Sequence, residues 1–296
     1  MAWAVGGKHR PCDSSDVLTR RLLLACCAAT LAVPGYAFGL EPHWRLAVRR
    51  HRVESWRGPR LRAAIIADLH AGEPFMGPAR VRRIVASAQA LRPDLVLMLG
   101  DYGSTNRWVT RLTPPAEIAP ILAGLRAPLG CYAIAGNHDW WDDAAATTRA
   151  AAPEWLRALA AAGVTTLQNR AERHPAGFWI AGLDSQGAFR RRGADDLAGT
   201  LAQLTDDAPA ILLAHEPDIF PRVPERIALT LSGHTHGGQV RLLGWSPHVP
   251  SRFGNRYALG HVREGRRELI VSGGLGTSIL PVRFGVPPEL TLVELG

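Results

Sequence analysis

Hydrophobic and polar residues in the first part of the domain follow two different periods. Residues 61–67 and 95–99 are almost uninterrupted apolar runs, which are typical of strands buried on both faces. Between them, apolar residues recur at i, i+3, i+4 and i+7 from Val81, the spacing of one helical face. The pattern therefore predicts a β-α-β unit with its helix at residues 78–91.

The rest of the chain continues this alternation and then becomes rich in strands. Helices are predicted at residues 116–125 and 144–162, the second in spite of Pro153. Short apolar runs predict further strands at residues 130–135, 178–181, 210–214, 227–232, 239–243, 257–261, 268–272 and 290–295. Alternating strands and helices followed by dense strands indicate sheets sandwiched between helices. We therefore expect one large α/β domain, which fits a chain of 296 residues.

The N-terminal 40 residues differ from this domain. Residues 1–40 read as a leader whose apolar stretch, 22–40, directly follows the pair Arg20-Arg21. Such a stretch is typical of a signal peptide or a membrane anchor, and the arginine pair is typical of twin-arginine export. A buried N-terminal helix is the alternative. We expect membrane attachment or export to a bacterial periplasm or cell envelope, a linker or edge strand at residues 41–60, and the domain at residues 61–296.

Composition and charge narrow the partners. The formal net charge is +8 and Lys8 is the only lysine, so the positive charge is almost all arginine. This balance suits phosphates or anionic lipid headgroups, but it also fits a general arginine bias. Basic residues are not interleaved with aromatic residues, which argues against a nucleic-acid surface. Cys131 is the only cysteine beyond the leader, so the domain has no disulfide framework.

Five short motifs rich in histidine and carboxylate residues each follow an apolar, strand-like run. They are Asp68-Leu69-His70, Gly100-Asp101, Gly136-Asn137-His138-Asp139, Ala214-His215-Glu216 and Gly233-His234-Thr235-His236. Ligands of open α/β sheets gather beyond the carboxyl ends of strands, where all five motifs are expected. Their nitrogen and oxygen donors suffice for two metal ions, and the absence of cysteine argues against a structural zinc site and favours a pair of hard or borderline metal ions.

The order and composition of these motifs resemble the calcineurin-like metallophosphoesterase superfamily over residues 61–296. The motifs at 237–240, 274–278 and 281–290 are similar to a bacterial membrane- or wall-associated branch. That branch includes the twin-arginine-exported phosphoesterase of Bacillus and the UDP-2,3-diacylglucosamine hydrolases. The resemblance implies a four-layer α/β/β/α sandwich.

The resemblance also implies roles for individual residues. One metal ion would be held by Asp68, His70, Asp101 and His236, and the other by Asp101, Asn137, His215 and His234, with Asp101 as the bridge. His138 would stabilise the phosphate or protonate the leaving oxygen, oriented by Asp139. A hydroxide that bridges the two ions would attack phosphorus in line. The tyrosine of purple acid phosphatases is replaced by Ser104, which argues against a ferric-tyrosinate centre and favours Mn, Zn or Fe as divalent ions.

Weaker candidates surround this set. Arg190 and Arg283 are possible contacts for an anionic substrate, although a solvated loop and a structural ion pair are the alternatives. Trp140 and Trp141 form either an apolar wall of the site or part of the core. The remaining histidines, His248 among them, are expected to be ordinary surface or core residues.

The sequence therefore predicts a dinuclear metal-dependent phosphohydrolase. We expect it to cleave a phosphodiester or pyrophosphate bond, and the apolar N-terminal segment favours a lipid-linked substrate at the membrane. A nuclease or cyclic-nucleotide phosphodiesterase is the alternative with the same metal ligands. A non-catalytic, membrane-tethered domain stabilised by its metals is the alternative from another class.

Overall fold

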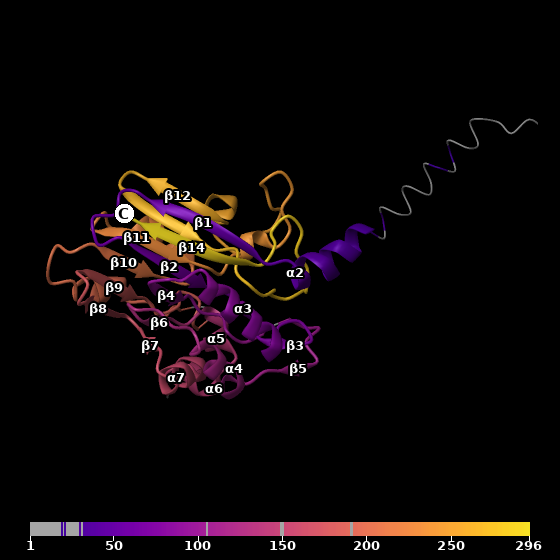
Figure 1. The fold of residues 1–296 in the computed structure, drawn as a ribbon, viewed down its shortest axis with the longest axis horizontal. Helices are drawn as coiled ribbons and strands as arrows, with labels where there is room; N and C mark the ends of the chain where they lie inside the picture. Colours follow the sequence, from indigo (N-terminus) through magenta and orange to yellow (C-terminus); the bar gives the residue numbers. More distant parts are fainter. Residues whose placement is uncertain are drawn as a thin grey trace, which may run out of the picture.

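Two six-stranded sheets form the centre of the molecule. The computed structural model describes Thr19, Arg21, Thr30 and residues 32–104, 106–148, 151–189 and 192–296. Within these residues one sheet has the strand order β1-β14-β2-β4-β6-β7 and the other β12-β13-β11-β10-β9-β8. The two sheets pack face to face on a shared apolar layer, and Figure 1 shows most helices on one side of the strands.

The first sheet places three motif-bearing strands next to one another. Its strands are β1 (Ala47–Val53), β2 (Leu61–Ile66), β4 (Leu95–Met98), β6 (Cys131–Ala133), β7 (Thr165–Thr166) and β14 (Glu289–Leu295). β2, β4, β6 and β7 run parallel, whereas β14 is antiparallel to β2. Because β2, β4 and β6 are parallel neighbours, the residues after each of them lie at one edge of the sheet.

The second sheet repeats this arrangement with two more motifs. It comprises β8 (Arg170–His174), β9 (Phe178–Gly182), β10 (Ala210–Leu213), β11 (Ile227–Ser232), β12 (Gly260–Glu264) and β13 (Arg267–Val271). β9, β10, β11 and β13 are parallel, and β8 and β12 close the two edges as antiparallel strands. The carboxyl ends of β10 and β11 therefore lie together, as those of β2, β4 and β6 do.

Three hydrophobic layers hold the sheets and helices together. Along β2, Ile65 faces the apolar layer between the two sheets, whereas Ile66 faces the layer under the helices. In β10, Leu213 faces the layer between the sheets and Leu212 faces the opposite side. This period of two explains why these strands read as continuous apolar runs.

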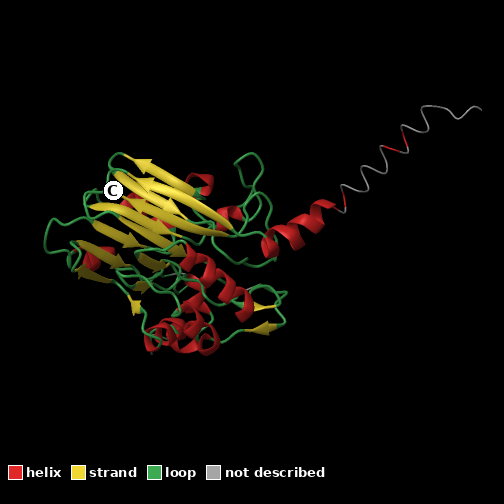
Figure 2. Cartoon of the chain, in the orientation of Figure 1, coloured by secondary structure: helices red, strands yellow, loops and turns green. Residues whose placement is uncertain are grey.

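Helices cover the outer faces of both sheets, and Figure 2 shows the larger group of them below the strands. The first sheet is covered by α3 (Pro78–Ala90), α4 (Pro115–Leu122), α5 (Asn137–Trp141), α6 (Ala144–Thr147) and α7 (Glu154–Ala161), and the second by α8 (Leu197–Leu201) and the short 3-10 helices η2 (Pro217–Arg222) and η4 (Gly254–Tyr257). A small sheet of β3 (Gly72–Glu73) and β5 (Arg111–Leu112) lies beside α3. The predicted α/β class and its α/β/β/α layering are confirmed.

The helix predicted at residues 144–162 is wrong in its continuity. The structure has two helices, α6 and α7, with Pro153 immediately before the second. Asp143 accepts hydrogen bonds from the backbone N–H groups of Ala145 and Glu154, at 2.9 and 2.8 Å. One carboxylate thus caps α6 and holds the start of α7, and proline has no N–H to continue a single helix.

Two predicted strands near the C-terminus also need correction. Residues 239–243 form the loop after the short 3-10 helix η3 (His236–Gly238), because Gln239 and Leu243 have positive φ angles of 58° and 51°. Such angles end an extended strand. The strand expected at residues 257–261 lies later, at β12, because residues 254–257 form η4.

The N-terminal part of the described chain packs on the domain. The short helix η1 (Tyr36–Leu40) continues as α2 (Glu41–Trp44), and β1 is the edge strand of the first sheet, one of the two alternatives for residues 41–60. Residues 1–18, 20, 22–29 and 31 lie outside the described part, and with them most of the predicted leader. No helix within the described residues is long and apolar enough to cross a membrane.

Candidate metal centre

All five motifs meet where the two sheets end. Asp68 and His70 follow β2, Asp101 follows β4, and Asn137 begins α5 just after β6. His215 follows β10, and His234 and His236 follow β11. The parallel strands bring these side chains to one place although up to 168 residues separate them in the sequence.

The donors form two groups of three residues, all buried except His234, which is partly buried. In one group, ligand atoms of Asp68, His70 and His236 lie within 4.8 Å of one another, and in the other those of Asp101, His215 and His234 do. Oδ2 of Asp101 is 3.2 Å from Nε2 of His215 and 3.8 Å from Nε2 of His70. Asp101 therefore lies between the two groups, the position required of a bridging carboxylate.

The backbone at these ligands is strained. Asp68, His70, Asp101, His234 and His236 all have positive φ angles, between 48° and 69°. Residues other than glycine, asparagine and aspartate rarely adopt this left-handed conformation, which costs about 1 kcal/mol or more per residue. Strain of this kind persists at functional sites because the surrounding structure imposes it. Here it turns the side chains that follow the strands back toward one centre.

Glycines allow the close approach that this geometry requires. Gly100 has a φ of 94°, and a Cβ atom added to it would lie 2.2 Å from the backbone nitrogen of Gly136. A Cβ on Gly136 would in turn lie 2.2 Å from Oδ1 of Asp101. Neither position has room for a side chain, so the loops after β4 and β6 depend on glycine to bring Asp101 and Asn137 together.

Several buried polar atoms of the site have no partner within the described protein. The Asn137 side chain is buried, and neither its oxygen nor its nitrogen has a hydrogen bond. Oδ2 of Asp68 is also without a partner. Buried polar groups of this kind are costly unless an ion or water satisfies them. The oxygen and imidazole donors therefore fit a pair of divalent metal ions, with Asn137 as a neutral oxygen ligand.

Burial keeps three of the histidines ready to act as ligands. It lowers the pKa of His70 to about 4, and it lowers the pKa values of His234 and His236 as well. Neighbouring histidines and, for His236, Arg283 add to this effect. A neutral imidazole has a free lone pair, which metal binding requires.

The carboxylates carry the negative charge of the site unevenly. Burial opposes ionisation of Asp101, but the fields of His215 and His138 outweigh it and hold the pKa of Asp101 well below its usual range. Burial, together with the charge of Asp101, raises the pKa of Asp68 to about 7. A metal-free site thus concentrates its negative charge on Asp101, between the two groups of ligands.

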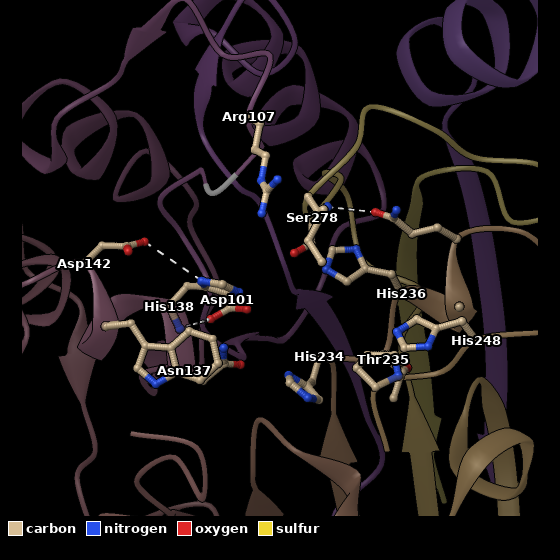
Figure 3. A pocket seen from close by; sticks show the side chains of 15 residues that line it. Asp101, Arg107, Asn137, His138, Asp142, His234, Thr235, His236, His248 and Ser278 are labelled. Carbon is tan, nitrogen blue, oxygen red and sulfur yellow. Dashed lines mark hydrogen bonds and ion pairs between the residues drawn. The ribbon is translucent and has the colours of Figure 1, made fainter. Parts of the chain in front are cut away.

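His138 faces the cavity, but Asp139 does not orient it as the sequence analysis expects. The Asp139 carboxylate is buried and accepts hydrogen bonds from the backbone N–H groups of Asp101, Tyr102 and Gly136, at 2.8, 3.0 and 2.8 Å. The carboxylate nearest to Nδ1 of His138 is that of Asp142, at 3.9 Å, one helical turn further on (Figure 3). Asp139 therefore fixes the loops that carry Asp101 and Asn137.

The two arginines proposed as substrate contacts have different outcomes. Arg190 lies outside the described residues. Arg283 is fully buried, and its guanidinium donates to the carbonyl groups of Gly273, Gly276 and Val286. One of its nitrogens lies 3.3 Å from Nδ1 of His236. Arg283 thus lies behind a ligand and supports the loop after β13, leaving no exposed surface for a substrate.

A cavity of about 490 Å³ opens beside the ligands. Its walls include residues that the sequence analysis left unassigned or treated as ordinary: Arg107, Gln239, His248 and Ser278. Figure 3 shows Arg107 and His138 pointing into the cavity from one side and His234 and His236 from the other. Arg107 and His248 lie on loops outside every motif named above, so the local sequence gives no signal for them. Gln239 and Ser278 belong to the motifs at 237–240 and 274–278, which carried no predicted role in the site. Trp141 also lines the cavity, whereas Trp140 is buried in the core.

Comparison with known proteins agrees with this geometry. Residues 61–238 match the calcineurin-like phosphoesterase family. The chain belongs to this family. As a calcineurin-like phosphoesterase it is a hydrolase of phosphate esters with a metal-binding site, and the resemblance to this superfamily is confirmed.

Relatives of this calcineurin-like phosphoesterase occur in bacteria and animals. It is 30% identical over 273 residues to the uncharacterized metallophosphoesterase YkuE of Bacillus subtilis, covering 88% of this chain and 89% of the relative. It is 31% identical over 300 residues to the phosphodiesterase YaeI of Escherichia coli, covering 94% of this chain and 100% of that protein. A transmembrane protein with a metallophosphoesterase domain from Danio rerio is 30% identical over 298 residues, and the match covers 95% of this chain and 64% of that protein.

Proposed function

We propose that the protein is a dinuclear phosphohydrolase that cleaves a phosphodiester or pyrophosphate bond. The observation that carries the proposal is the position of Asp101 between two groups of buried ligands, Asp68, His70 and His236 on one side and His215 and His234 on the other. One carboxylate within 4 Å of both groups suits two neighbouring divalent ions of Mn, Zn or Fe. Two such ions would clamp the attacking and leaving oxygens of an in-line displacement.

The residues of the chain have separate tasks in this reaction. When bound, the metal pair supplies a hydroxide nucleophile and positive charge at the phosphate. Asn137 completes the second group of ligands with its side-chain oxygen. His138 lies on the cavity side of the ligands, where its imidazole hydrogen-bonds a phosphate oxygen or protonates the leaving oxygen. Arg107 points into the same cavity and provides a positive charge for the phosphate.

We also propose that the substrate is lipid-linked and that the reaction takes place at the membrane of an exported or membrane-associated enzyme. Trp141 and Ile279 line the cavity and give it an apolar wall beside the polar ligands. A phosphate group attached to an apolar chain matches both kinds of wall. The name of the phosphodiesterase YaeI supports a diester as the bond that is cleaved.

Hydrolysis by the full chain loaded with Mn²⁺ tests this function. We expect turnover of bis-p-nitrophenyl phosphate and slower turnover of the monoester. In His138→Ala we expect a loss of about 100-fold or more, the usual contribution of a general acid. Comparison with a diacylglucosamine nucleotide tests the lipid-linked substrate. A metal-loaded protein that hydrolyses none of the three would contradict the proposal and favour a non-catalytic domain.

A further inference from the structure

Large apolar side chains are exposed around the mouth of the cavity. Leu243 is 108% exposed, Ile279 57%, Trp245 59% and Trp108 55%. We call six of the exposed apolar residues of these loops and of the N-terminal helix the apolar rim: Phe38, Trp108, Leu242, Leu243, Trp245 and Ile279. Single exposed apolar residues are common on soluble proteins, but a contiguous group marks a site of interaction.

The segments that carry the apolar rim contact one another. The rings of Phe38 and Trp108 stack with their centroids 5.9 Å apart, and the N–H of Arg107 donates to the carbonyl of Ile279. The loop around Leu242 is bound to the loop after Ile279, because Arg241 donates its N–H to Phe284. Figure 1 shows the late loops, in orange and yellow, at the same end of the molecule as the N-terminal helix. These contacts bring the segments of the apolar rim together beside the cavity, which Ile279 lines.

Two residues of the apolar rim are held in a strained conformation. Leu243 and Ile279 have positive φ angles of 51° and 63°. For a β-branched residue such as isoleucine this is a genuine outlier, and the two-residue turn at Leu243-Gly244 normally favours Asn-Gly. Neither side chain is buried in the core, so packing does not explain its presence. Strain combined with exposure points to a function outside the domain itself.

The charge of this surface selects a kind of partner. Residues 32–40, 106–109, 239–250 and 276–286 contain no aspartate or glutamate, whereas Arg107 and Arg241 flank the apolar rim. Exposed tryptophan beside aliphatic residues and arginine is the composition of surfaces that lie in the interface of an anionic bilayer. A second copy of the chain is a poorer fit, because pairing this face with itself would bring arginines of like charge together.

We propose that the apolar rim docks on an anionic lipid bilayer and turns the mouth of the cavity toward the membrane surface. The N-terminal helix fixes this orientation, because the carbonyl of Ala37 accepts a hydrogen bond from the N–H of Arg283 and Phe38 belongs to the rim. Docking gives the proposed lipid-linked substrate a path into the site that does not cross water. The inference rests on the proposed function for its purpose, but the docking itself is tested without any substrate.

Quenching of tryptophan fluorescence by brominated lipid tests the contact directly. The full chain is mixed with vesicles of brominated phosphatidylcholine and phosphatidylglycerol, and the same is done for Trp108→Phe, Trp245→Phe and Trp56→Phe. Among the described residues the exposed tryptophans are Trp108, Trp245 and Trp44, the last at the end of the N-terminal helix. Because these three share the lipid-dependent quenching, we expect each rim variant to lose roughly a third of it. Trp56 is buried, so Trp56→Phe is the matched control and should change nothing.

A second variant separates docking from folding. Leu243→Asn places the favoured Asn-Gly pair in the turn, so its melting temperature should equal or exceed that of the unchanged protein. Its quenching by brominated lipid should nevertheless fall at least twofold. Ala198→Glu, on an exposed position of α8, is the control for a change on a remote surface.

The outcomes are decisive in both directions. Quenching that is equal in the rim variants and the unchanged protein overturns the proposal, because any vesicle contact then involves other parts of the chain. If the change in Trp245 fluorescence depends on protein concentration and not on lipid, the rim contacts a second copy of the chain, and the proposal is overturned. Hydrolysis of bis-p-nitrophenyl phosphate by the same preparations without lipid reports separately on the proposed function, so failure of one proposal does not mimic failure of the other.

Discussion

The metal ligands and the apolar rim meet at one cavity, which His234 and His236 line from the ligands and Ile279 from the rim. The protein builds these two regions in different ways. The ligands follow five central strands, are buried, and are held by backbone contacts such as those of Asp139. The rim lies on loops and on the N-terminal helix, and its side chains face away from the core. Both regions contain residues with positive φ angles, at Asp101 and at Leu243 for example. Backbone strain therefore occurs both at the metal ligands and in the apolar rim, whereas burial occurs only at the ligands.

This difference has a consequence for substitutions. A change among the ligands should abolish activity through the loss of charge or of an oxygen donor. A change at rim residues that do not line the cavity, such as Leu243 and Trp245, should leave chemistry on soluble substrates intact. Changes in the groups that support the ligands should act first on the stability of the fold. The following predictions test this separation.

The largest effect is expected for Asp101→Asn. The amide has nearly the same size but lacks the negative charge that Asp101 concentrates between the two groups of ligands. We expect kcat/KM for bis-p-nitrophenyl phosphate to fall about 1,000-fold or more, with loss of at least one bound metal ion. Steady-state kinetics with metal analysis measures both, and the exposed Asp207→Asn is the control. Retention of two metals at full activity would refute the bridging role.

The next largest effect is expected for Arg283→Met, and it concerns stability. The guanidinium donates to four backbone carbonyls within the core, and a methionine removes all of these hydrogen bonds. We expect the free energy of unfolding to fall by about 3–5 kcal/mol, the usual cost of removing a buried charged partner. Urea titration measures it, with the half-exposed Arg49→Met as the control. A loss under 1 kcal/mol would show that Arg283 does not hold the loop after β13.

A smaller effect is expected for Asp139→Asn. Whether stability or the pH profile changes shows whether Asp139 holds the loops of the site or orients His138. Its carboxylate accepts three backbone hydrogen bonds, and an amide presents its NH2 group to at least one of those donors. We expect unfolding to become easier by about 1–3 kcal/mol and metal to bind more weakly. If Asp139 instead oriented His138, the variant would change the pH profile of kcat while the urea midpoint stayed the same.

Much of the metal centre could be predicted from the sequence, because each ligand is marked by the residues immediately before it. Asp68, Asp101 and His234 each stand directly beyond an apolar strand, and parallel strands bring such positions together. The partners of Asp139 could not be predicted in this way, because a carboxylate next to a histidine in sequence need not face it in a helix. Whether the seven ligand candidates bind metal stays a prediction.

The rest of the cavity and the breaks in secondary structure depend on contacts between distant segments. Arg107 and His248 come from loops whose conformation is set by neighbours far away in the sequence, such as Ile279 beside Arg107. The apolar periodicity of residues 144–162 continues across Pro153, so it predicts one helix. The helix is nevertheless interrupted there, because proline has no backbone N–H to donate. The burial of Arg283 likewise depends on tertiary contacts. From its charge alone, Arg283 would be predicted to lie on the surface.

The smallest effect concerns His43, which ties the N-terminal helix to the domain on the rim side of the molecule. Its Nδ1 lies 3.2 Å from Arg80, its ring stacks on Phe75, and burial together with Arg80 lowers its pKa to about 4. Because the folded pKa is below the unfolded value of 6.5, the unfolded chain takes up the proton first as the pH falls. Stability is therefore lost between pH 6.5 and 4.

We expect this loss to be about 1 kcal/mol between pH 7 and 5, since the ring is only half-buried and solvent weakens the effect. His43→Phe keeps the stacked ring but cannot titrate, so urea titrations at the two pH values should show a smaller acid loss in the variant than in the unchanged protein. Equal losses in both would mean that acid does not act on the domain through this contact. A smaller loss in the variant would show that mild acid weakens the packing of α2, and with it the helix that carries Phe38 into the rim, while the ligands behind it stay in place.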